Sequence, residues 1–431
     1  MIRLSRTLFF LTVILATVAS AQQRPAIRPL GAVTQKSPET FSGLLTVRPL
    51  SNGSVLVNDV GGKRVVLFDP SLTKATIVAD TTPATGNAYP GAQFSSGSLI
   101  AYRGDSTLFV DAQSQSMLVI DPSGKVGRVM AIPRAEDAGM IGNSIGNAAF
   151  DAEGRLIYRA PPRFTFRGAP GGGGGPPVIP EPPDSALVMR VDLATRKLDT
   201  VGVIRTPKIK LETKTDDNGR ISITSMINPL PVVDDWTVTS DGTVAFVRGK
   251  DYHIDWLSPD GTKTSSAKIP FDWQRLTDED KVAFIDSVKA ARERLGANAP
   301  APVLGGGGAP GGGGGAPQVQ IFRGSGGPGG APAGGPAQLN FIPASELPDY
   351  KPPFFAGSVR ADRDGNVWIR TISAVAGGSV YDVVNRKGEL IDRVQVPADH
   401  SILGFGPNGT VILLNRGTTA TSGTLEIASI R

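Results

Sequence analysis

Few side chains in this sequence have the types and spacing that catalysis or metal binding would need. The chain has no cysteine and only two histidines, His253 and His400, which lie far apart along it. Transition-metal sites usually combine several Cys, His and carboxylate ligands, so a site of that kind is not expected. A catalytic triad needs an acidic residue to orient its base. The candidate Asp residues fall at strand ends or turns, where Asp usually caps backbone groups. We therefore predict no catalytic residue.

Five polar residues are candidate ligand-binding groups because they lie at or near strands that the pattern below places innermost. Arginine and asparagine in such positions suit a small anionic or polar ligand. The alternative is that they are merely hydrated, as charged side chains usually are. The five residues are Arg48, Asn147, Asp235, Arg360 and His400.

A short hairpin signal recurs along the chain. Six times, an Asn, Asp, Ser or Glu followed by glycine precedes an apolar strand, as in Asp241-Gly242 before Val244. Such dipeptides favour tight turns because glycine adopts positive φ readily. Six copies indicate a repeat architecture. The copies begin at Asn52, Ser96, Glu153, Asp241, Asp364 and Asn408.

Each copy is followed by a second hairpin, which gives units of four antiparallel strands. The first unit is predicted at 44–48, 55–59, 65–68 and 76–79, and the inner strand of the second near 91–95. The last unit has three strands, so 30–35 is predicted to pair with 424–429 and complete it, which removes an open edge. The fold class is therefore all-β, a six-bladed β-propeller closed by N- and C-terminal strands in one blade. A seventh blade within 205–232 is the alternative.

One hairpin carries a family resemblance. Residues Asp362 to Ile369, D-R-D-G-N-V-W-I, resemble the repeat of NHL-like and TolB-like six-bladed propellers, and Val119 to Lys125 resembles their outer turn. The resemblance implies the fold and no particular chemistry, because these families share hairpins and not one activity.

A second resemblance concerns metal binding and is kept as an alternative. Residues 147–154, N-A-A-F-D-A-E-G, are similar to a metal-binding stretch of SMP-30/gluconolactonase propellers, although Ala148 replaces their Asp. That resemblance implies a divalent cation such as calcium in the channel, held by Glu39, Asn147 and Asp235. Hard cations prefer such oxygen ligands. The protein would then be a metal-dependent lactonase or esterase; the main prediction has no cofactor.

Three insertions interrupt the repeat. Residues 161–184 are rich in Gly and Pro, 205–232 read as an extra hairpin, and 271–355 read as a helix with Thr277 as N-cap followed by a disordered Gly/Pro tract. Because strands alternate in direction, all three should emerge on one face of the disc. We predict that this face binds a protein, peptide or glycan partner, and that the protein is a non-catalytic binding or scaffolding module.

The N-terminus predicts export. Residues 1–21 have the basic start, apolar run and A-S-A cleavage site of a signal peptide, and the apolar run is too short for a membrane anchor. The remaining 22–431 should form one propeller domain, soluble in the periplasm or secreted, without a transmembrane segment. The formal net charge of +5 includes no basic run that would indicate nucleic-acid binding, and a monomer is expected.

Overall fold

The computed structural model describes residues 24–42, 45–86, 88–89, 98–112, 114–141, 148–161, 183–215, 221–295, 340–373, 375–417 and 422–431. The predicted signal peptide and most of both Gly/Pro-rich tracts lie outside these residues. Within them, no helix is both long and apolar enough to cross a membrane.

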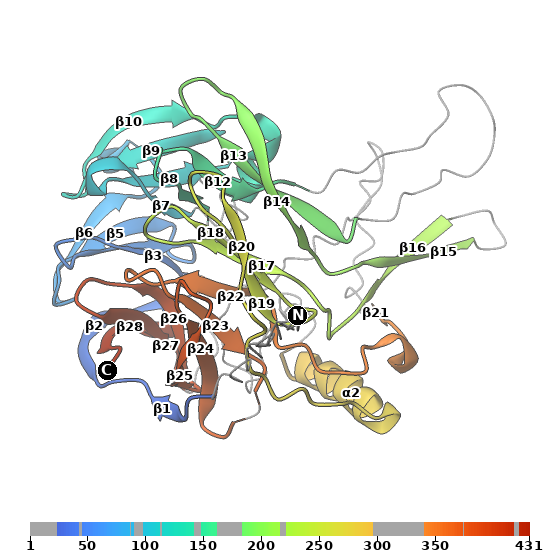
Figure 1. The fold of residues 1–431 in the computed structure, drawn as a ribbon. Helices are drawn as coiled ribbons and strands as arrows, with labels where there is room; N and C mark the ends of the chain where they lie inside the picture. Colours follow the sequence, from blue (N-terminus) through green and yellow to red (C-terminus); the bar gives the residue numbers. More distant parts are fainter. Residues whose placement is uncertain are drawn as a thin grey trace, which may run out of the picture.

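Six antiparallel sheets form the blades of a propeller, as predicted (Figure 1). In every blade the strand that comes first in sequence is innermost, except that blades five and six each also receive an outer strand from the N-terminal segment. Blade one contains β3 (Leu45–Pro49), β4 (Val55–Asp59), β5 (Arg64–Phe68) and β6 (Ala75–Ala79). Blade two contains β7 (Leu99–Ala101), β8 (Thr107–Asp111), β9 (Ser116–Ile120) and β10 (Val126–Ala131). Blade three contains β11 (Ala149–Phe150), β12 (Leu156–Arg159), β13 (Ser185–Val191) and β14 (Leu198–Arg205).

The other three blades follow the same order. Blade four contains β17 (Asp235–Val238), β18 (Val244–Arg248), β19 (His253–Leu257) and β20 (Lys263–Ser265). Blade five contains β22 (Phe354–Ala361), β23 (Val367–Thr371), β24 (Gly378–Val384) and β25 (Leu390–Pro397). Blade six contains β26 (His400–Phe405), β27 (Thr410–Asn415) and β28 (Ser422–Ser429), with β2 (Val33–Ser42) as its outermost strand.

The ring closes by the predicted pairing of the two ends of the chain. Strand β2 runs antiparallel to β28, with Val33 opposite Ala428 and Lys36 opposite Glu426. The N-terminal segment also makes a second contact, which was not predicted from the sequence. Strand β1 (Ile27–Pro29) pairs in parallel with β25 and gives blade five a fifth strand. The N-terminal segment therefore covers the outer edges of two blades.

Hairpin turns follow the chemistry that their sequences require. The glycines of the five repeat copies within the described residues all have positive φ, from 64° at Gly409 to 87° at Gly53. The Ser96-Gly97 copy lies outside the described residues.

The inner strand of blade two differs from its prediction. The strand after Ser96-Gly97, β7, is the innermost strand of that blade, so the prediction of an inner strand near 91–95 is wrong. At three residues β7 is too short to show an alternating pattern.

The hydrophobic core is divided into clusters between neighbouring blades. One cluster joins blades four and five through Tyr252 and Phe354, and another joins blades five and six through Trp368 and Phe405. The remaining four blade interfaces each have a similar cluster. Because every blade buries apolar side chains against both neighbours, the ring is held together by the hydrophobic effect.

A small module is attached beside blade five (Figure 1). Its sheet consists of β15 (Lys210–Thr215), β16 (Ile221–Ile227) and β21 (Asn340–Phe341), and its helix is α2 (Asp278–Leu295). The predicted hairpin is thus a separate sheet and not a seventh blade. Buried Ile285 and Ile342 of the module pack with Phe355 and Ile372 of blade five. The remaining short helices are α1 (Ala138–Ile141), η1 (Pro83–Thr85), η2 (Arg103–Asp105), η3 (Ala135–Asp137) and η4 (Ala344–Glu346).

The start of α2 confirms the predicted N-cap. The hydroxyl of Thr277 accepts a hydrogen bond from the Asp280 amide at 3.2 Å, and the Asp280 carboxylate accepts one from the Thr277 amide at 3.0 Å. This reciprocal pair is a capping box. Val282, in the first turns of this helix, is 50% exposed.

Candidate functional site

A pocket of about 700 Å³ opens at one end of the central channel. All six innermost strands contribute residues from their carboxyl ends, so the pocket is the mouth of the channel. The contributing residues are Arg48 and Pro49 of β3, Ala101 of β7, Ala149 and Phe150 of β11, Val238 of β17, Ala361 of β22 and Phe405 of β26. The turns that follow these strands complete its walls.

The pocket lies at the end of the propeller opposite to the insertions. It is built at the turns between first and second strands, whereas the insertions follow second strands or connect one blade to the next. Since strand direction alternates within a blade, these two sets of loops emerge on opposite faces. The face predicted from the sequence to bind a partner is the other one, although Arg48, a predicted ligand-binding residue, lies in this pocket. The repeat itself points to this pocket, because the pocket is formed where the innermost strands end.

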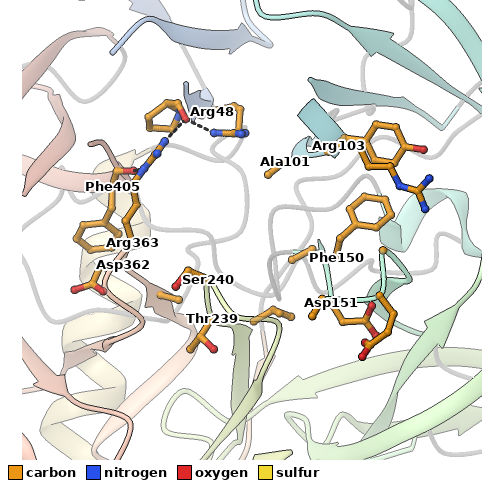
Figure 2. Close-up of a pocket in the computed structure, with 18 residues that line it drawn as sticks. Arg48, Ala101, Arg103, Phe150, Asp151, Thr239, Ser240, Asp362, Arg363 and Phe405 are labelled. Atoms are coloured by element: carbon orange, nitrogen blue, oxygen red, sulfur yellow. Dashed lines mark hydrogen bonds between the residues drawn. The ribbon is translucent and has the colours of Figure 1, made fainter. Parts of the chain in front are cut away.

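Two arginines converge on one wall of the pocket (Figure 2). The guanidinium groups of Arg48 and Arg363 both donate hydrogen bonds to the Pro49 carbonyl oxygen, the Arg363 bond being 2.7 Å long. Arg363 also donates from Nε to the Phe405 carbonyl oxygen at 3.3 Å. Arg48 forms an ion pair of 2.8 Å with Asp105, while Arg363 has no carboxylate within ion-pair distance in the described part of the chain.

Burial and charge set the protonation of this wall. Burial lowers the pKa of Arg48; the charge of Asp105 opposes this effect, and the charge of Arg363 adds to it. Burial alone would raise the pKa of Asp105, but hydrogen bonds from Ser51 and the charge of Arg48 outweigh it and lower the pKa. At neutral pH Arg48 remains charged, because the ordinary guanidinium pKa lies far above 7.

The opposite wall is aromatic. Phe150 and Tyr102 pack with ring centroids 5.1 Å apart, and Figure 2 shows Phe150 and Arg103 across the pocket from Arg48 and Arg363. Phe405, beside Arg363, packs on Trp368 with a centroid distance of 4.9 Å. Apolar rings and alanines thus provide most of the surface around the few charged groups, which is typical of sites for small organic ligands.

Two carboxylates that line the pocket are occupied by bonds within the protein. Asp151 accepts hydrogen bonds from the Arg155 amide at 2.9 Å and from Arg155 Nε at 2.8 Å. Asp362 accepts bonds from the Asn366 amide at 2.8 Å and from Trp368 Nε1 at 2.9 Å. Both residues are buried and fix the turns that shape the pocket.

Of the five candidate ligand-binding residues, the structure places Arg48 in the pocket. Asp235, only 3% exposed, lies at the other end of its strand. Its carboxylate accepts hydrogen bonds from the amides of Trp236 at 2.9 Å and of Val359 at 3.1 Å. Burial raises its pKa to about 6, and these hydrogen bonds oppose the shift.

Arg360 lies in β22 near Asp235. Burial lowers the pKa of Arg360, and the negative charge of Asp235 counteracts part of that effect. The pKa of Arg159 in blade three is likewise lowered by burial, and the charge of Asp235 opposes that shift. The charge of Asp235 therefore acts on two partly buried arginines of the neighbouring blades three and five.

His400 sits between two carboxylates of blade six. Its Nδ1 lies 2.7 Å from Asp399 Oδ1 and its Nε2 lies 2.8 Å from Glu426 Oε2. Glu426 also accepts a bond of 2.9 Å from Asn415 Nδ2. His400 is thus engaged within its own blade and does not line the pocket at the channel mouth. Asn147 lies outside the described residues.

Glu39 and Asp235, two residues of the alternative metal site, are not brought together, and the third, Asn147, lies outside the described residues. Glu39 lies on β2, the outermost strand of blade six, and its carboxylate forms an ion pair of 2.9 Å with Arg64. Asp235 lies on the innermost strand of blade four. Glu39 precedes the inner strand of blade one in sequence, but the chain reaches that strand from the rim of the disc. Within the described residues, no three His, Cys, Asp or Glu side chains group as metal ligands would.

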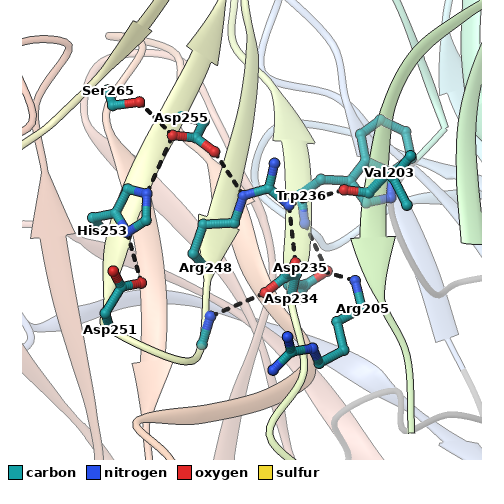
Figure 3. Close-up of polar contacts among 11 residues, drawn as sticks. Val203, Arg205, Asp234, Asp235, Trp236, Arg248, Asp251, His253, Asp255 and Ser265 are labelled. Atoms are coloured by element: carbon teal, nitrogen blue, oxygen red, sulfur yellow. Dashed lines mark hydrogen bonds and ion pairs between the residues drawn. The ribbon is translucent and has the colours of Figure 1, made fainter. Parts of the chain in front are cut away.

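A separate charge network on blade four involves the other histidine (Figure 3). Arg248 bridges Asp234 at 2.9 Å and Asp255 at 2.7 Å, and His253 lies between Asp251 and Asp255. These contacts link adjacent strands and the loop before β17. His253 is thus hydrogen-bonded within a structural network of blade four.

One short stretch of the sequence matches a hydrolase signature. Residues 142–146, G-N-S-I-G, match the G-x-S-x-G pattern of the hydrolase nucleophile elbow but lie outside the described residues. That elbow follows a strand and precedes a helix. Here helix α1 comes before the motif and strand β11 after it, which is the reverse order. The motif therefore lacks the context that would support it.

Comparisons with known proteins show a likeness in fold to solved structures and nothing more specific. No protein-family model and no curated protein matches the chain. Among solved structures, a gluconolactonase from Xanthomonas campestris is 10% identical with a TM-score of 0.36, covering 94% of this chain and 99% of that one. A streptogramin B lyase is 11% identical with a TM-score of 0.30, covering 91% and 87%. The calcium-binding protein regucalcin from Agrobacterium tumefaciens is 10% identical with a TM-score of 0.32, covering 94% and 97%. At such values the likeness is one of fold, and no activity follows from it.

Proposed function

We propose that this propeller binds a small organic ligand at the mouth of its channel. The convergence of all six inner strands on one pocket of about 700 Å³ carries the proposal. Ligand sites usually occupy a few hundred to about 1,000 Å³ and combine apolar walls with few polar groups. Strand ends held by interlocked blades also provide the rigid support that a binding site needs.

Binding without catalysis is the function that this pocket supports best. Its lining contains no histidine or cysteine, and the carboxylates of Asp151 and Asp362 already accept hydrogen bonds from their own turns. A general base needs a free acceptor within reach of its substrate. The charged groups of the pocket are therefore suited to recognition.

A plugged variant tests the proposal. Ala101 lies on the pocket wall and is exposed, so Ala101→Trp should fill the pocket without disturbing the core. Ala75→Trp, on the exposed outer strand of blade one, is the matched control. Ligand-observed NMR with a fragment library should find binders that Ala101→Trp abolishes and Ala75→Trp leaves unchanged. Binders unaffected by Ala101→Trp, or the absence of any binder, would contradict the proposal.

Partner binding by the insertion-bearing face remains a separate prediction. The module of β15, β16, β21 and α2 projects from that part of the propeller (Figure 1) and offers a surface for a protein, peptide or glycan. Partner capture by a chain lacking 297–338 checks it. That deletion leaves α2 and β21 in place, so loss of capture would implicate the removed tract.

The lactonase or esterase alternative also remains a prediction and has a direct test. Glu39 is neutralised by Arg64 and Asp235 accepts backbone hydrogen bonds, so neither carboxylate is poised to hold calcium. A cation specific to the folded state must raise the melting temperature. We expect no rise with calcium. A rise of several degrees that Asp235→Ala abolishes would favour the metal-dependent enzyme.

A further inference from the structure

We infer that the ligand at the channel mouth is an organic oxyanion, a carboxylate or phosphate on a flat apolar body, and that Arg363 selects it. The inference rests on the proposed binding function and specifies the chemistry of the same pocket. It begins from the arginine pair, in which the guanidinium groups of Arg363 and Arg48 share the Pro49 carbonyl oxygen as acceptor.

The pair leaves an excess of positive charge on its wall. Arg48 is balanced by Asp105 at 2.8 Å, but no carboxylate lies within 4.0 Å of Arg363 in the part of the chain that the structure describes. The charge of Arg363 also acts on Arg48, whose pKa it helps to lower. Two like charges held together by one neutral carbonyl repel each other, and a bound anion would relieve that repulsion.

Arg363 retains hydrogen-bond donors for a ligand. A guanidinium carries five N–H groups in a planar fork. Arg363 uses Nε and Nη2 to hold the carbonyl oxygens of Phe405 and Pro49, and Nη1 donates to no described group. The two backbone bonds orient the fork in advance, so a ligand need not order this side chain itself. Arginine binds carboxylates and phosphates strongly through such charge-assisted bonds.

The rest of the pocket does not favour a cation. The carboxylates of Asp151 and Asp362 are buried and hydrogen-bonded within their turns. Glu153, which is half exposed, forms an ion pair of 2.8 Å with Arg155. Arg103 adds a third positive charge across the pocket. The pocket therefore offers positively charged hydrogen-bond donors to an anion, while these acidic groups are already paired.

The aromatic wall determines the body of the ligand. Phe150 lies opposite the arginine pair with Tyr102 packed against it, and Phe405 lies beside Arg363. Aromatic side chains favour flat apolar groups in stacked or edge-to-face contact. A ring system that carries one anionic group can therefore contact both walls at the same time.

Matched probes of one shape test the inference by isothermal titration calorimetry on the full chain. The probes are 2-naphthoate, its neutral isostere 2-naphthamide, 2-naphthyl phosphate and inorganic phosphate. We expect the two naphthyl anions to bind at least tenfold more tightly than 2-naphthamide and than inorganic phosphate. Arg363→Gln should remove at least tenfold of the anions' affinity and leave 2-naphthamide unchanged, and Arg363→Lys should recover part of it. Lys263→Gln, which removes an exposed positive charge on β20, is the control for net charge.

Each contrary outcome identifies what fails. If none of the naphthyl probes binds, the proposed binding function fails together with the inference. If 2-naphthamide binds as tightly as 2-naphthoate, the binding function stands and the anion preference is overturned. Anion binding that Arg363→Gln leaves intact would overturn the role of Arg363. Inorganic phosphate binding as tightly as 2-naphthyl phosphate would overturn the requirement for an apolar body.

Discussion

The carboxylate of Asp235 accepts a hydrogen bond of 3.1 Å from the backbone amide of Val359. The bond joins β17 of blade four to β22 of blade five, where the register of β22 against β23 shifts between Phe354 and Val359. The shift exposes backbone amides of β22 that its partner strand does not satisfy, and Asp235 provides an acceptor for one of them. The same carboxylate lies within a ring of buried strands, so it is costly to ionise.

Stability should therefore depend on pH through Asp235. Burial raises the pKa of Asp235 in the folded protein to about 6, from an ordinary value of 3.8. Between these values the folded state binds a proton that the unfolded state does not, so the contribution to stability is fully present below pH 3.8 and declines as pH rises to 6. Relative to Asp235→Asn, the wild type should lose about 2 kcal/mol of unfolding free energy between pH 4.5 and 7.5. Urea unfolding of both proteins at the two pH values measures this difference, and equal pH dependence would show that Asp235 does not titrate in this range.

The sequence predicted the blades well because their turns are locally encoded. Val55–Asp59 is observed with the predicted bounds, and β18 begins at Val244, directly after the predicted turn, since an Asx-Gly turn and an apolar run define each strand. Strand β1 has three residues and β21 two, too few for periodicity to appear, and both depend on pairing with distant strands. These pairings could only come from tertiary structure.

The candidate site was predicted in part for the same reason. Arg48 was identified because it ends a predicted inner strand. Arg363 was not, because its role depends on a contact with Pro49, 314 positions away. Glu39 was a candidate metal ligand in the channel because it is close in sequence to β3. Its strand, β2, pairs with β28 instead, and this pairing places Glu39 on the rim of the disc.

Ring closure by the N-terminal segment predicts a large effect of truncation. Deleting residues 24–36 would remove β1, the first part of β2 and the ion pair between Arg28 and Asp392 at 2.6 Å. The outer edges of blades five and six would then be open. We expect the melting temperature to fall by on the order of 10 °C relative to a chain that begins at residue 24. Differential scanning calorimetry of the two chains is the measurement, and equal melting temperatures would argue against closure by this segment.

The capping box of α2 predicts a local effect. Thr277→Ala removes the side-chain acceptor of the Asp280 amide, which should cost about 1 kcal/mol of helix stability. Amide exchange in the first turn of α2 should become faster, while exchange in the blade strands should not change. Thr264→Ala, at an exposed position of β20, is the control. If exchange in α2 responds equally to both substitutions, the cap is not what holds the helix start.

Two glycines with the same backbone conformation should respond differently to alanine. Gly242 and Gly261 have φ of 84° and 89°, so Gly→Ala strains the backbone at both, by about 1 kcal/mol. At Gly242, an added Cβ would also lie 2.3 Å from the backbone nitrogen of Ala152 in the neighbouring blade, while at Gly261 it would meet nothing within 4 Å. Because a backbone atom cannot yield as a flexible side chain can, Gly242→Ala should be destabilising by at least about 1 kcal/mol more than Gly261→Ala. Chemical denaturation of the two variants measures the difference. Equal losses would mean that the turns of blades three and four do not pack as closely as the structure shows, and the shape of the pocket wall between Asp151 and Thr239 would then have to be revised.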